Sequence, residues 1–315
     1  MLSTVTRLVT GGVDAAVATA AAAAGDLLGS RPENPLDERD PGYIRTTLPA
    51  YRLLTRLYFR PKVRGLEHIP ADGPVLLVGN HSGGTLIADT FAFAYEFYDH
   101  FGPDRLFHQL AHDMVFAVPG LATLRKYGTI PASHENAERA LGKGAALLVY
   151  PGGDHESYRP TSHANRIEFG DRKGFIRLAL ASDVPIVPVV AAGGQETALF
   201  LTRGQRAASL LQLDRMFRLK VLPVQFAPPW GLTVFDLPGR VPLPAQITLQ
   251  VLPPIDLREQ YGARPDVDEV YAGVTGEMQR ALDELAAERD LPVVGTVGPR
   301  SDDSTVAEEL ARARR

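Results

Sequence analysis

The chain has 315 residues, of which 45% are hydrophobic and 22% are charged, and its formal net charge at pH 7 is −4. This length accommodates one large α/β domain with appendages, and the charge balance lacks the excess of cations that is typical of nucleic-acid binding. The sequence contains no cysteine, which excludes disulfides, thiolate metal sites and cysteine nucleophiles and is typical of a reducing compartment.

The N-terminal region is rich in small side chains. Residues 1–29 predict a surface or interfacial helix, and the prolines and charges of residues 29–42 predict a linker. The stretch 13–25 is mostly alanine and is interrupted by Asp14, so it is too short and too weakly apolar for a membrane-spanning helix or a secretory signal. We therefore expect a cytoplasmic location.

Residues 43–64 interleave basic side chains with aromatic residues and leucine. The basic ones are Arg45, Arg52, Arg56, Arg60, Lys62 and Arg64. A helix with this pattern can lie in a lipid interface, where anionic headgroups attract its cations. The alternative is a helix that packs on its own domain and keeps a solvated basic face.

A glycine-rich loop follows the first clear strand. The short apolar run 74–78 predicts a buried strand, and the residues that follow are Gly79-Asn80-His81-Ser82-Gly83-Gly84-Thr85-Leu86-Ile87-Ala88-Asp89. The two glycines after His81 allow a tight bend, and the apolar run 86–93 predicts a buried helix. Such a strand-to-helix turn is where α/β sheets bind ligands.

The next segment contains two histidines with helical spacing. Residues 105–113 predict a strand or a strand–helix junction, and residues 116–127 predict a helix. His108 and His112 are four positions apart, as in zinc proteases, but Gln109 stands where that motif has glutamate. We therefore expect no metal site.

A second glycine-rich turn follows another apolar strand. Residues 145–150 predict this strand, and the turn 151–160 begins Pro-Gly-Gly. A helix to about residue 181 and a strand over 184–190 follow.

The last third of the chain is less regular. Residues 193–230 mix basic and apolar side chains and end at the only tryptophan, so they predict either a lipid-facing flap or an ordinary helix on the sheet. Residues 246–251 predict a strand, and residues 267–288 predict a helix whose apolar stripe packs in the core. Residues 295–315 are polar without a clear period, which is typical of a flexible tail.

Four blocks of this chain resemble, in the same order, those of the phospholipid/glycerol acyltransferase family. They are Asn80-His81 with an acid downstream; Tyr127-Gly128-Thr129-Ile130-Pro131-Ala132; Pro151-Gly152-Gly153 with Glu156; and Arg172-Lys173-Gly174 leading into residues 184–189. Members of this family are membrane-associated enzymes that move a fatty acyl group onto a glycerolipid hydroxyl. The third block has Pro-Gly-Gly where the family usually has Pro-Glu-Gly, which is similar to the branch that includes diacylglycerol acyltransferases.

The resemblance implies a mixed α/β fold with a largely parallel central sheet flanked by helices and with N-terminal interfacial helices. It divides the chain into an N-terminal region of helices and linker at 1–64, an acyltransferase domain at 65–292 and a flexible tail at 293–315. The implied function is transfer of a long-chain acyl group from acyl-CoA, as co-substrate and without a cofactor, to a glycerolipid or lysophospholipid hydroxyl. The implied location is peripheral, on the inner face of the cell membrane.

The resemblance also assigns His81 as the general base and an acid as its partner. The family usually has four residues between the two, but here the fifth residue after His81 is Leu86 and the first acid is Asp89, eight positions on (89 − 81 = 8). Eight residues of continuous helix span about 12 Å, so this dyad requires part of the segment to be looped. The other acids that remain candidates are Asp113, Asp154 and Glu156.

Several residues are expected to bind the substrates. Backbone amides around Ser82, Gly83 and Gly84, or those of Gly152 and Gly153, are candidate donors to the developing oxyanion. The cations expected to bind phosphates of coenzyme A or of an acceptor are Arg159, Arg172 and Lys173, and Glu156 is expected to bind the acceptor or to position a cation.

Recognition of a phosphorylated acceptor is a separate question. Related enzymes have an arginine near the position of Ser133, and its absence puts a phosphorylated acceptor in doubt. Arg125 and Lys126 are the nearest cations in sequence that can substitute for it.

Two other functions stay open. A serine hydrolase or thioesterase would use Ser82 as nucleophile, although the chain has no Gly-x-Ser-x-Gly motif. A non-catalytic lipid-binding protein would keep the fold, and the altered spacing between His81 and Asp89 favours this reading.

Overall fold

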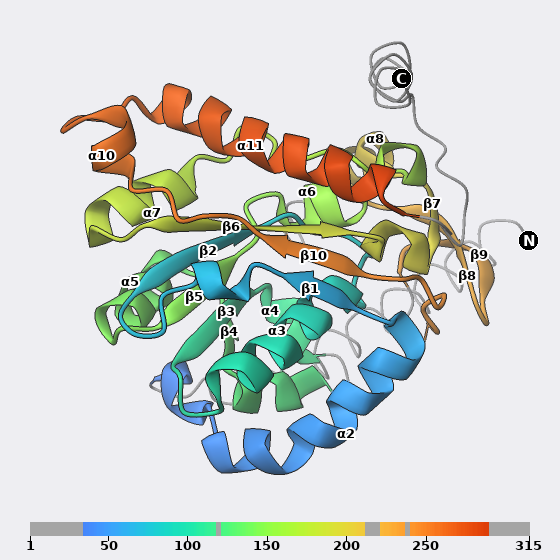
Figure 1. Cartoon of the computed structure of the whole chain (residues 1–315). Helices are drawn as coiled ribbons and strands as arrows, with labels where there is room; N and C mark the ends of the chain where they lie inside the picture. The colour runs from blue at the N-terminus through green and yellow to red at the C-terminus, as the bar shows by residue number, and fades with distance from the viewer. Residues whose placement is uncertain (1–33, 118–120, 212–220, 237–239, 290–315) are drawn as a thin grey trace, which may run out of the picture.

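The computed structural model describes residues 34–117, 121–211, 221–236 and 240–289. Its centre is a seven-stranded sheet with the strand order β1-β10-β6-β2-β5-β3-β4 (Figure 1). The strands are β1 Lys62–Arg64, β2 Val75–Gly79, β3 Phe107–Ala111, β4 Thr129–Pro131, β5 Ala146–Val149, β6 Ile186–Ala192 and β10 Thr248–Val251. All neighbours are parallel except β10 and β6, so the predicted mixed, largely parallel α/β fold is confirmed.

Helices cover both faces of this sheet (Figure 1). The α-helices are α2 Pro41–Phe59, α3 Ala88–Phe101, α4 Asp113–Ala117, α5 His134–Gly142, α6 Gly153–Ser157, α7 Gly174–Ser182, α8 Gln205–Leu210, α10 Leu257–Tyr261 and α11 Val267–Ala287. Short 3-10 helices are η1 Pro35–Glu38, η2 Leu66–His68, η3 Leu121–Tyr127, η4 Thr161–His163 and η5 Gly194–Thr197.

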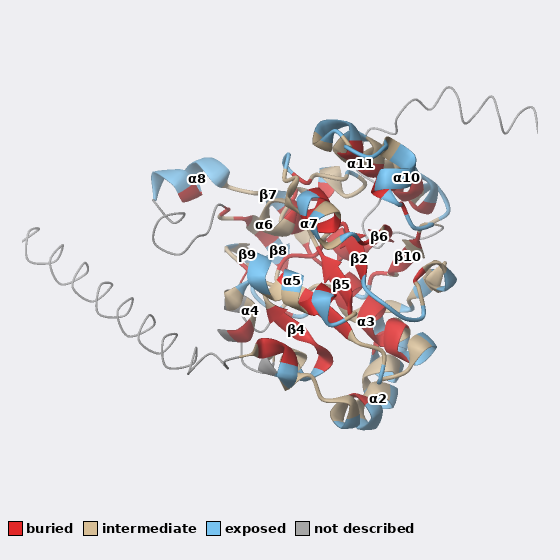
Figure 2. Cartoon of the chain, turned by 90° about the vertical axis from the view of Figure 1, so that its left-hand side faces the viewer, coloured by how far each residue is buried: buried red, intermediate tan, exposed pale blue. Residues whose placement is uncertain are grey.

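The central strand β2 shows why its sequence is apolar throughout. Leu76 and Val78 pack in a core with α5, α7 and α11, whereas Val75 and Leu77 pack in a second core with α2 and α3. Successive side chains of a strand point to opposite faces, and both faces are covered here, so every position must be apolar. Figure 2 shows that buried residues are concentrated in the strands of the large sheet.

Several predicted elements are confirmed. Helix α11 follows the predicted 267–288, and its apolar stripe of Val270, Val274, Met278, Ala281, Leu282 and Leu285 is buried. Strands β6 and β10 lie within two residues of their predicted bounds. The predicted helix at 116–127 is instead split between α4 and the 3-10 helix η3, in accordance with the helix-breaking Pro119-Gly120.

The segment after β6 differs from the predicted helix. Its described residues form a second, antiparallel sheet in the order β7-β8-β9, with β7 Leu199–Thr202, β8 Val224–Ala227 and β9 Gly231–Val234, and they form an α-helix at α8. The alternative of an ordinary helix is wrong for β7, β8 and β9, and in β8 and β9 more buried and more exposed side chains alternate with the period of a strand.

Helix α2 packs on α3, and its cations are not free. Arg52 donates to both carboxylate oxygens of Glu96, at 3.1 and 3.0 Å, and Arg56 donates to the same carboxylate at 3.2 Å. Arg45 pairs with Asp104. The expected attraction of these cations to lipid headgroups therefore lacks support, because acids of the protein already neutralise them.

The proposed domain boundaries stay predictions. Within the described part of the chain, β1 lies at the edge of the large sheet, and the predicted N-terminal helix at 1–29 and tail at 293–315 lie outside the described residues. None of the described helices combines the length and the apolar character that crossing a membrane requires.

Candidate active site

The two glycine-rich turns meet at the same edge of the large sheet. His81 lies two residues after β2, and Tyr150 follows β5 directly. These strands are parallel neighbours with Val78 opposite Val149, so their carboxyl ends are adjacent. The His81 ring stacks on the Tyr150 ring, with 4.3 Å between centroids and 25° between planes.

The imidazole of His81 is held as a neutral group. Burial, followed by the positive charge of Arg159, lowers the pKa of His81 to about 3. Its Nδ1 is buried without a hydrogen-bond partner. A neutral imidazole is the form that can accept a proton, but so low a pKa makes the isolated ring a weak base, so general-base action requires an acid that stabilises the imidazolium.

Asp89 lies in the first turn of α3, and its carboxylate contacts Ser82, the residue after His81. Its Oδ2 accepts a hydrogen bond from the Ser82 hydroxyl at 2.9 Å, and its Oδ1 accepts one from the Thr90 amide at 2.8 Å. The chain is looped between β2 and α3, as the spacing requires. Burial raises the pKa of Asp89 to about 6. No hydrogen bond joins Asp89 to the imidazole, so the dyad stays a prediction.

Ser82 is positioned as a partner of Asp89. Its side chain is 1% exposed, and a Cβ atom on Gly194 would collide with its hydroxyl. The hydroxyl donates to a carboxylate rather than to a histidine. The contacts of Ser82 are therefore those of a positioning group and give no support to its use as a nucleophile.

Glu156 ties the two turns together. Its carboxylate is fully buried; Oε2 accepts from the His81 amide at 2.9 Å, and Oε1 accepts from the Glu168 amide at 3.0 Å. Burial raises its pKa to about 7. Gly152 packs so closely on this carboxylate that a Cβ atom there would overlap it. The expected role of Glu156 in binding an acceptor or a cation lacks support, because both oxygens hold the backbone.

Arg159 is structural, and its predicted role as a phosphate ligand is wrong. Its side chain is 1% exposed, and it donates to the carbonyl oxygens of His81, Glu156, His163 and Ala164 at 2.5 to 3.0 Å. Backbone carbonyls occupy the guanidinium donors. Arg159 therefore stabilises the His81 turn and is not available to bind a ligand.

Arg172 and Lys173 are also occupied. Arg172 donates to the carbonyl oxygens of Pro151 and Gly152 and pairs with Asp154 at 3.0 Å. Lys173 lies between two carboxylates, those of Asp171 and Asp268, at 2.8 and 2.5 Å. The predicted phosphate-binding role of these two cations therefore lacks support. Asp154, a candidate partner of His81, is engaged by Arg172.

Most of the predicted oxyanion donors have partners within the chain. The Gly83 amide donates to Gln195 Oε1 at 3.2 Å, the Gly84 amide to the Ser157 carbonyl at 3.1 Å, and the Gly153 amide to the Tyr150 carbonyl at 3.1 Å. A hydrogen bond from the Ser82 amide contributes to the pKa of Asp89. These amides shape the turns instead of pointing to a ligand.

Two residues that follow the small sheet, Asp236 and Arg240, bind the His81 loop, and sequence reasoning missed them. Asp236 accepts from the Thr85 amide at 2.7 Å, and Arg240 donates to the Gly83 carbonyl at 2.6 Å. Arg240 and Asp236 form an ion pair at 2.8 Å with side chains 1% exposed. No motif marks them, because the contact spans about half of the chain.

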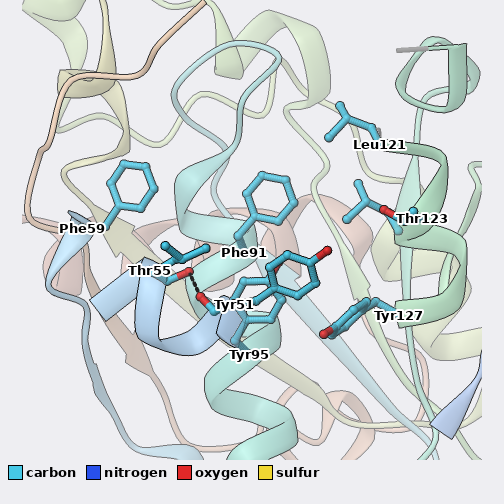
Figure 3. A pocket seen from close by; sticks show the side chains of 10 residues that line it. Tyr51, Thr55, Phe59, Phe91, Tyr95, Leu121, Thr123 and Tyr127 are labelled. Atoms are coloured by element: carbon cyan, nitrogen blue, oxygen red, sulfur yellow. Dashed lines mark hydrogen bonds between the residues drawn. The ribbon is translucent and has the colours of Figure 1, made fainter. Parts of the chain in front are cut away.

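An apolar cavity of about 220 Å³ opens between α2, α3 and η3 (Figure 3). Aromatic and aliphatic side chains dominate its lining, which consists of Tyr51, Leu54, Thr55, Phe59, Phe91, Tyr95, Leu121, Thr123, Leu124 and Tyr127. Phe91 is two residues from Asp89, and the neighbouring Thr90 hydroxyl donates to the Tyr150 hydroxyl at 2.7 Å. The cavity and the His81 turn are thus connected through successive residues of α3.

The two histidines with metal-like spacing do not lie on a helix. His108 belongs to strand β3, and its Nδ1 lies 3.0 Å from the Gly128 carbonyl oxygen. Across the described ranges, no group of three or more histidine, aspartate or glutamate side chains is arranged to hold a metal ion.

The chain matches one protein-family model and is similar to several known proteins. Residues 60–192 match the family model described as acyltransferase. An uncharacterized protein of Mycobacterium tuberculosis is 29% identical over 74% of this chain and 63% of its own length, so the chain spans less than two thirds of that relative. A Bos taurus protein named DGAT1/2-independent enzyme synthesizing storage lipids is 33% identical over 41% of this chain and 37% of its own length.

A solved structure shares the fold. The 1-acyl-sn-glycerophosphate acyltransferase PlsC of Thermotoga maritima superposes with a TM-score of 0.50 over 78% of this chain and 83% of that chain, at 17% identity. At this level of identity the likeness concerns the fold alone.

Proposed function

We propose that the chain transfers a long-chain fatty acyl group from acyl-CoA to a lipid hydroxyl, a proposal that the match of residues 60–192 to the acyltransferase family model supports. His81 takes the proton of the hydroxyl as its oxygen attacks the thioester carbonyl. A hydroxyl is a poor nucleophile at neutral pH, so a base must act during the attack. When the tetrahedral intermediate collapses, the carbon–sulfur bond breaks and the imidazolium returns the proton to the leaving thiolate of coenzyme A, which restores His81. No covalent enzyme intermediate is required.

The observation that carries this proposal is the state of the His81 ring. Its backbone is anchored on both sides, by Glu156 at the amide and by Arg159 at the carbonyl, while Nδ1 has no partner and the ring is neutral. An imidazole held by its main chain and left free to take a proton is positioned for general-base catalysis.

We assign Asp89 as the acid that stabilises the imidazolium. Glu156 is also adjacent, but both of its oxygens are bound by backbone amides, which cannot rotate. Asp89 Oδ2 is held by the Ser82 hydroxyl, which can rotate and release it. Asp89 is therefore the carboxylate that is free to respond when the ring becomes charged.

The apolar cavity suits an acyl chain. It is lined by aromatic and aliphatic side chains, and its volume of about 220 Å³ accommodates part of a long chain. Among the predicted oxyanion donors, the Gly152 amide, at the N-terminal end of α6, is the one that we assign to the oxyanion.

The acceptor that we propose is a neutral lipid hydroxyl. The cations expected to bind phosphate are engaged by the protein: Arg159 by carbonyls, Arg172 by Asp154, and Lys173 by Asp171 and Asp268. Arg125, named as a substitute for the missing arginine, pairs with Glu38 at 2.7 Å. The bovine relative, by its name, synthesizes storage lipids, which supports a neutral acceptor.

The test is release of coenzyme A from a long-chain acyl-CoA by the purified protein, with acylglycerols, lysophosphatidate and long-chain alcohols as acceptors. We expect release to depend on a neutral acceptor. His81→Ala removes the base and lowers kcat by about 10³-fold, and Asp89→Asn lowers it by about 10²-fold, with little change in KM for the donor.

The control is His134→Ala, which removes an exposed histidine at the start of α5. It should leave activity unchanged. Full activity of His81→Ala would refute the mechanism, and an inert wild type that still binds acyl-CoA would establish the non-catalytic alternative. A preference for lysophosphatidate would contradict the neutral acceptor.

A further inference from the structure

Large hydrophobic side chains are exposed in only a few places on the described part of the molecule. Twelve such residues are exposed there, and all lie in the second half of α2, in β7 and α8 with the residue that follows, or between residues 226 and 241. They are Leu53, Leu54, Leu57, Tyr58, Leu201, Leu210, Leu211, Phe226, Trp230, Leu232, Val234 and Val241. A concentration of this kind marks an interaction surface rather than chance exposure.

The small sheet is amphipathic, with its apolar side outward. Phe226 and Leu232 are directly paired across β8 and β9 and are 52% and 65% exposed, whereas Gln225 and Ala227, between and beside them, are buried. Trp230 lies in the turn that joins the two strands. We call the residues Leu201, Phe226, Trp230, Leu232 and Val234 the small-sheet face.

The end of α2 adjoins this face. The Tyr58 hydroxyl donates to the Pro242 carbonyl at 2.6 Å, and the amide of the preceding Val241 donates to the Pro228 carbonyl at 2.9 Å. Pro228 directly follows β8. Figure 1 shows the C-terminal end of α2 and the strands β8 and β9 at the same side of the molecule. The exposed leucines of α2 and the small-sheet face thus belong to one side.

The opposite face of the small sheet packs toward the loop that contains His81. Phe200 is buried there and packs on Tyr158, whose hydroxyl lies 2.7 Å from the Thr85 hydroxyl of the His81 loop. Asp236, just after β9, accepts from the Thr85 amide. The sheet that exposes the apolar side chains is therefore bonded directly to the catalytic loop.

We propose that the small-sheet face, together with the exposed leucines of α2, docks on the surface of a phospholipid bilayer. This inference rests on the proposed function, because a lipid acceptor resides in a bilayer and must reach His81. Residues 221–235 contain no charged side chain, and Trp230 has the side chain that favours the boundary between water and lipid.

The docking is apolar rather than electrostatic. Of the cations beside the exposed leucines, Arg52 and Arg56 are paired with Glu96, and Arg60 donates to the Pro244 carbonyl at 3.0 Å. Apolar insertion does not require anionic lipid and is only weakly affected by salt. Binding to neutral vesicles at high salt separates this mode from attraction by a basic helix.

The test is flotation of the full chain with phosphatidylcholine vesicles, at low and high salt, without acyl donor or acceptor. We expect the wild type to float at both salt concentrations. Leu232→Asp and Phe226→Asp place a charge on the small-sheet face and should lower the partition coefficient about tenfold. Gln260→Asp is the matched control, because it adds the same charge at an exposed position of α10, at the other end of the molecule (Figure 1), and should float like the wild type.

A second measurement separates this proposal from the proposed function. With acyl-CoA and acceptor dispersed in detergent, the two variants should release coenzyme A at the wild-type rate, which also shows that they are folded. An inert wild type in detergent would refute the function while flotation still reports docking. A wild type that does not float, or variants that float equally well, would overturn the docking. So would a wild-type dimer without vesicle binding that Leu232→Asp converts to a monomer, since the face would then belong to a second copy.

Discussion

The position of His81 is controlled through its main chain rather than through its ring. Glu156 accepts from its amide, Arg159 donates to its carbonyl, and the ring itself only stacks on Tyr150. A base that is held in this way keeps its ring nitrogens available for a substrate proton and for an acid partner. The buried Glu156 and Arg159 therefore position His81, and the imidazole itself carries out the proton transfer that we propose.

Ser82 offers a prediction with a defined pH dependence. Its hydroxyl lowers the pKa of Asp89, against the larger effect of burial, which raises it to about 6. In Ser82→Ala the pKa of Asp89 therefore rises further. Since Asp89 must be ionised to stabilise the imidazolium, activity is lost as pH falls through this pKa, and the acid limb of the kcat profile should move to higher pH. We also expect kcat at the pH optimum to fall about tenfold.

The control is Thr85→Val, which removes a hydroxyl of the same loop that contacts Tyr158 and not Asp89. Its acid limb should stay at the wild-type pH. Complete loss of acyl transfer in Ser82→Ala, with no residual activity at any pH, would instead establish Ser82 as a nucleophile.

At the scale of the element, the loop between β2 and α3 has a shape that only glycine permits. Gly83 and Gly84 have φ values of +93° and +68°, in the region that favours glycine. The amides of these residues and of Thr85 are bound by Gln195, Ser157 and Asp236. The bend is therefore set both by backbone freedom and by partners from distant parts of the chain.

Gly84→Ala should disrupt this loop. The new Cβ atom would lie 2.5 Å from a carboxylate oxygen of Asp236, so the steric contact adds to the cost of a positive φ. We expect the free energy of unfolding, measured by urea denaturation, to fall by about 3 kcal/mol. Acyl transfer should fall with it, because His81 lies three residues away.

Gly73→Ala separates the two contributions. Gly73 has a similar φ of +78°, but no atom lies within 4 Å of the position of its Cβ. This variant should lose only about 1 kcal/mol and keep its activity. Equal losses in the two variants would show that backbone strain alone, and not the contact with Asp236, determines the loop.

At the scale of the whole molecule, one buried ion pair joins the two sheets. Arg240 donates to Asp236, to the Thr197 carbonyl and to the Gly83 carbonyl of the His81 loop. Since breaking a buried pair leaves one charge without compensation, Asp236→Asn should lower the free energy of unfolding by about 3 kcal/mol. Loss of the carboxylate that binds the Thr85 amide should also reduce acyl transfer.

The exposed pair of Arg258 and Asp183 provides the comparison. It has a similar distance of 2.9 Å, but its side chains are 54% and 78% exposed, against 1% for Arg240 and Asp236. Asp183→Asn should therefore change the free energy of unfolding by less than about 1 kcal/mol. Similar effects of the two substitutions would mean that burial does not strengthen the inner pair.

The sequence by itself determined the fold class and the location of the His81 turn. The apolar runs that became β2, β5 and β6 and the helical stripe of α11 are local patterns, since period and burial follow from neighbouring residues. The family resemblance adds the candidate residues His81 and Asp89. Their placement at adjacent strand ends follows from the parallel order of β2 and β5.

Only the tertiary structure decided which charged residues are free. The sequence predicted Arg159, Arg172 and Lys173 as phosphate ligands because they are cations near the glycine-rich turn. In the structure, carbonyls and carboxylates of the protein already bind them. The contact of Asp236 with the His81 loop and the apolar side formed by α2 and the small sheet are long-range. Pairing between segments far apart in the chain depends on how the elements pack, and no local pattern of residues encodes it.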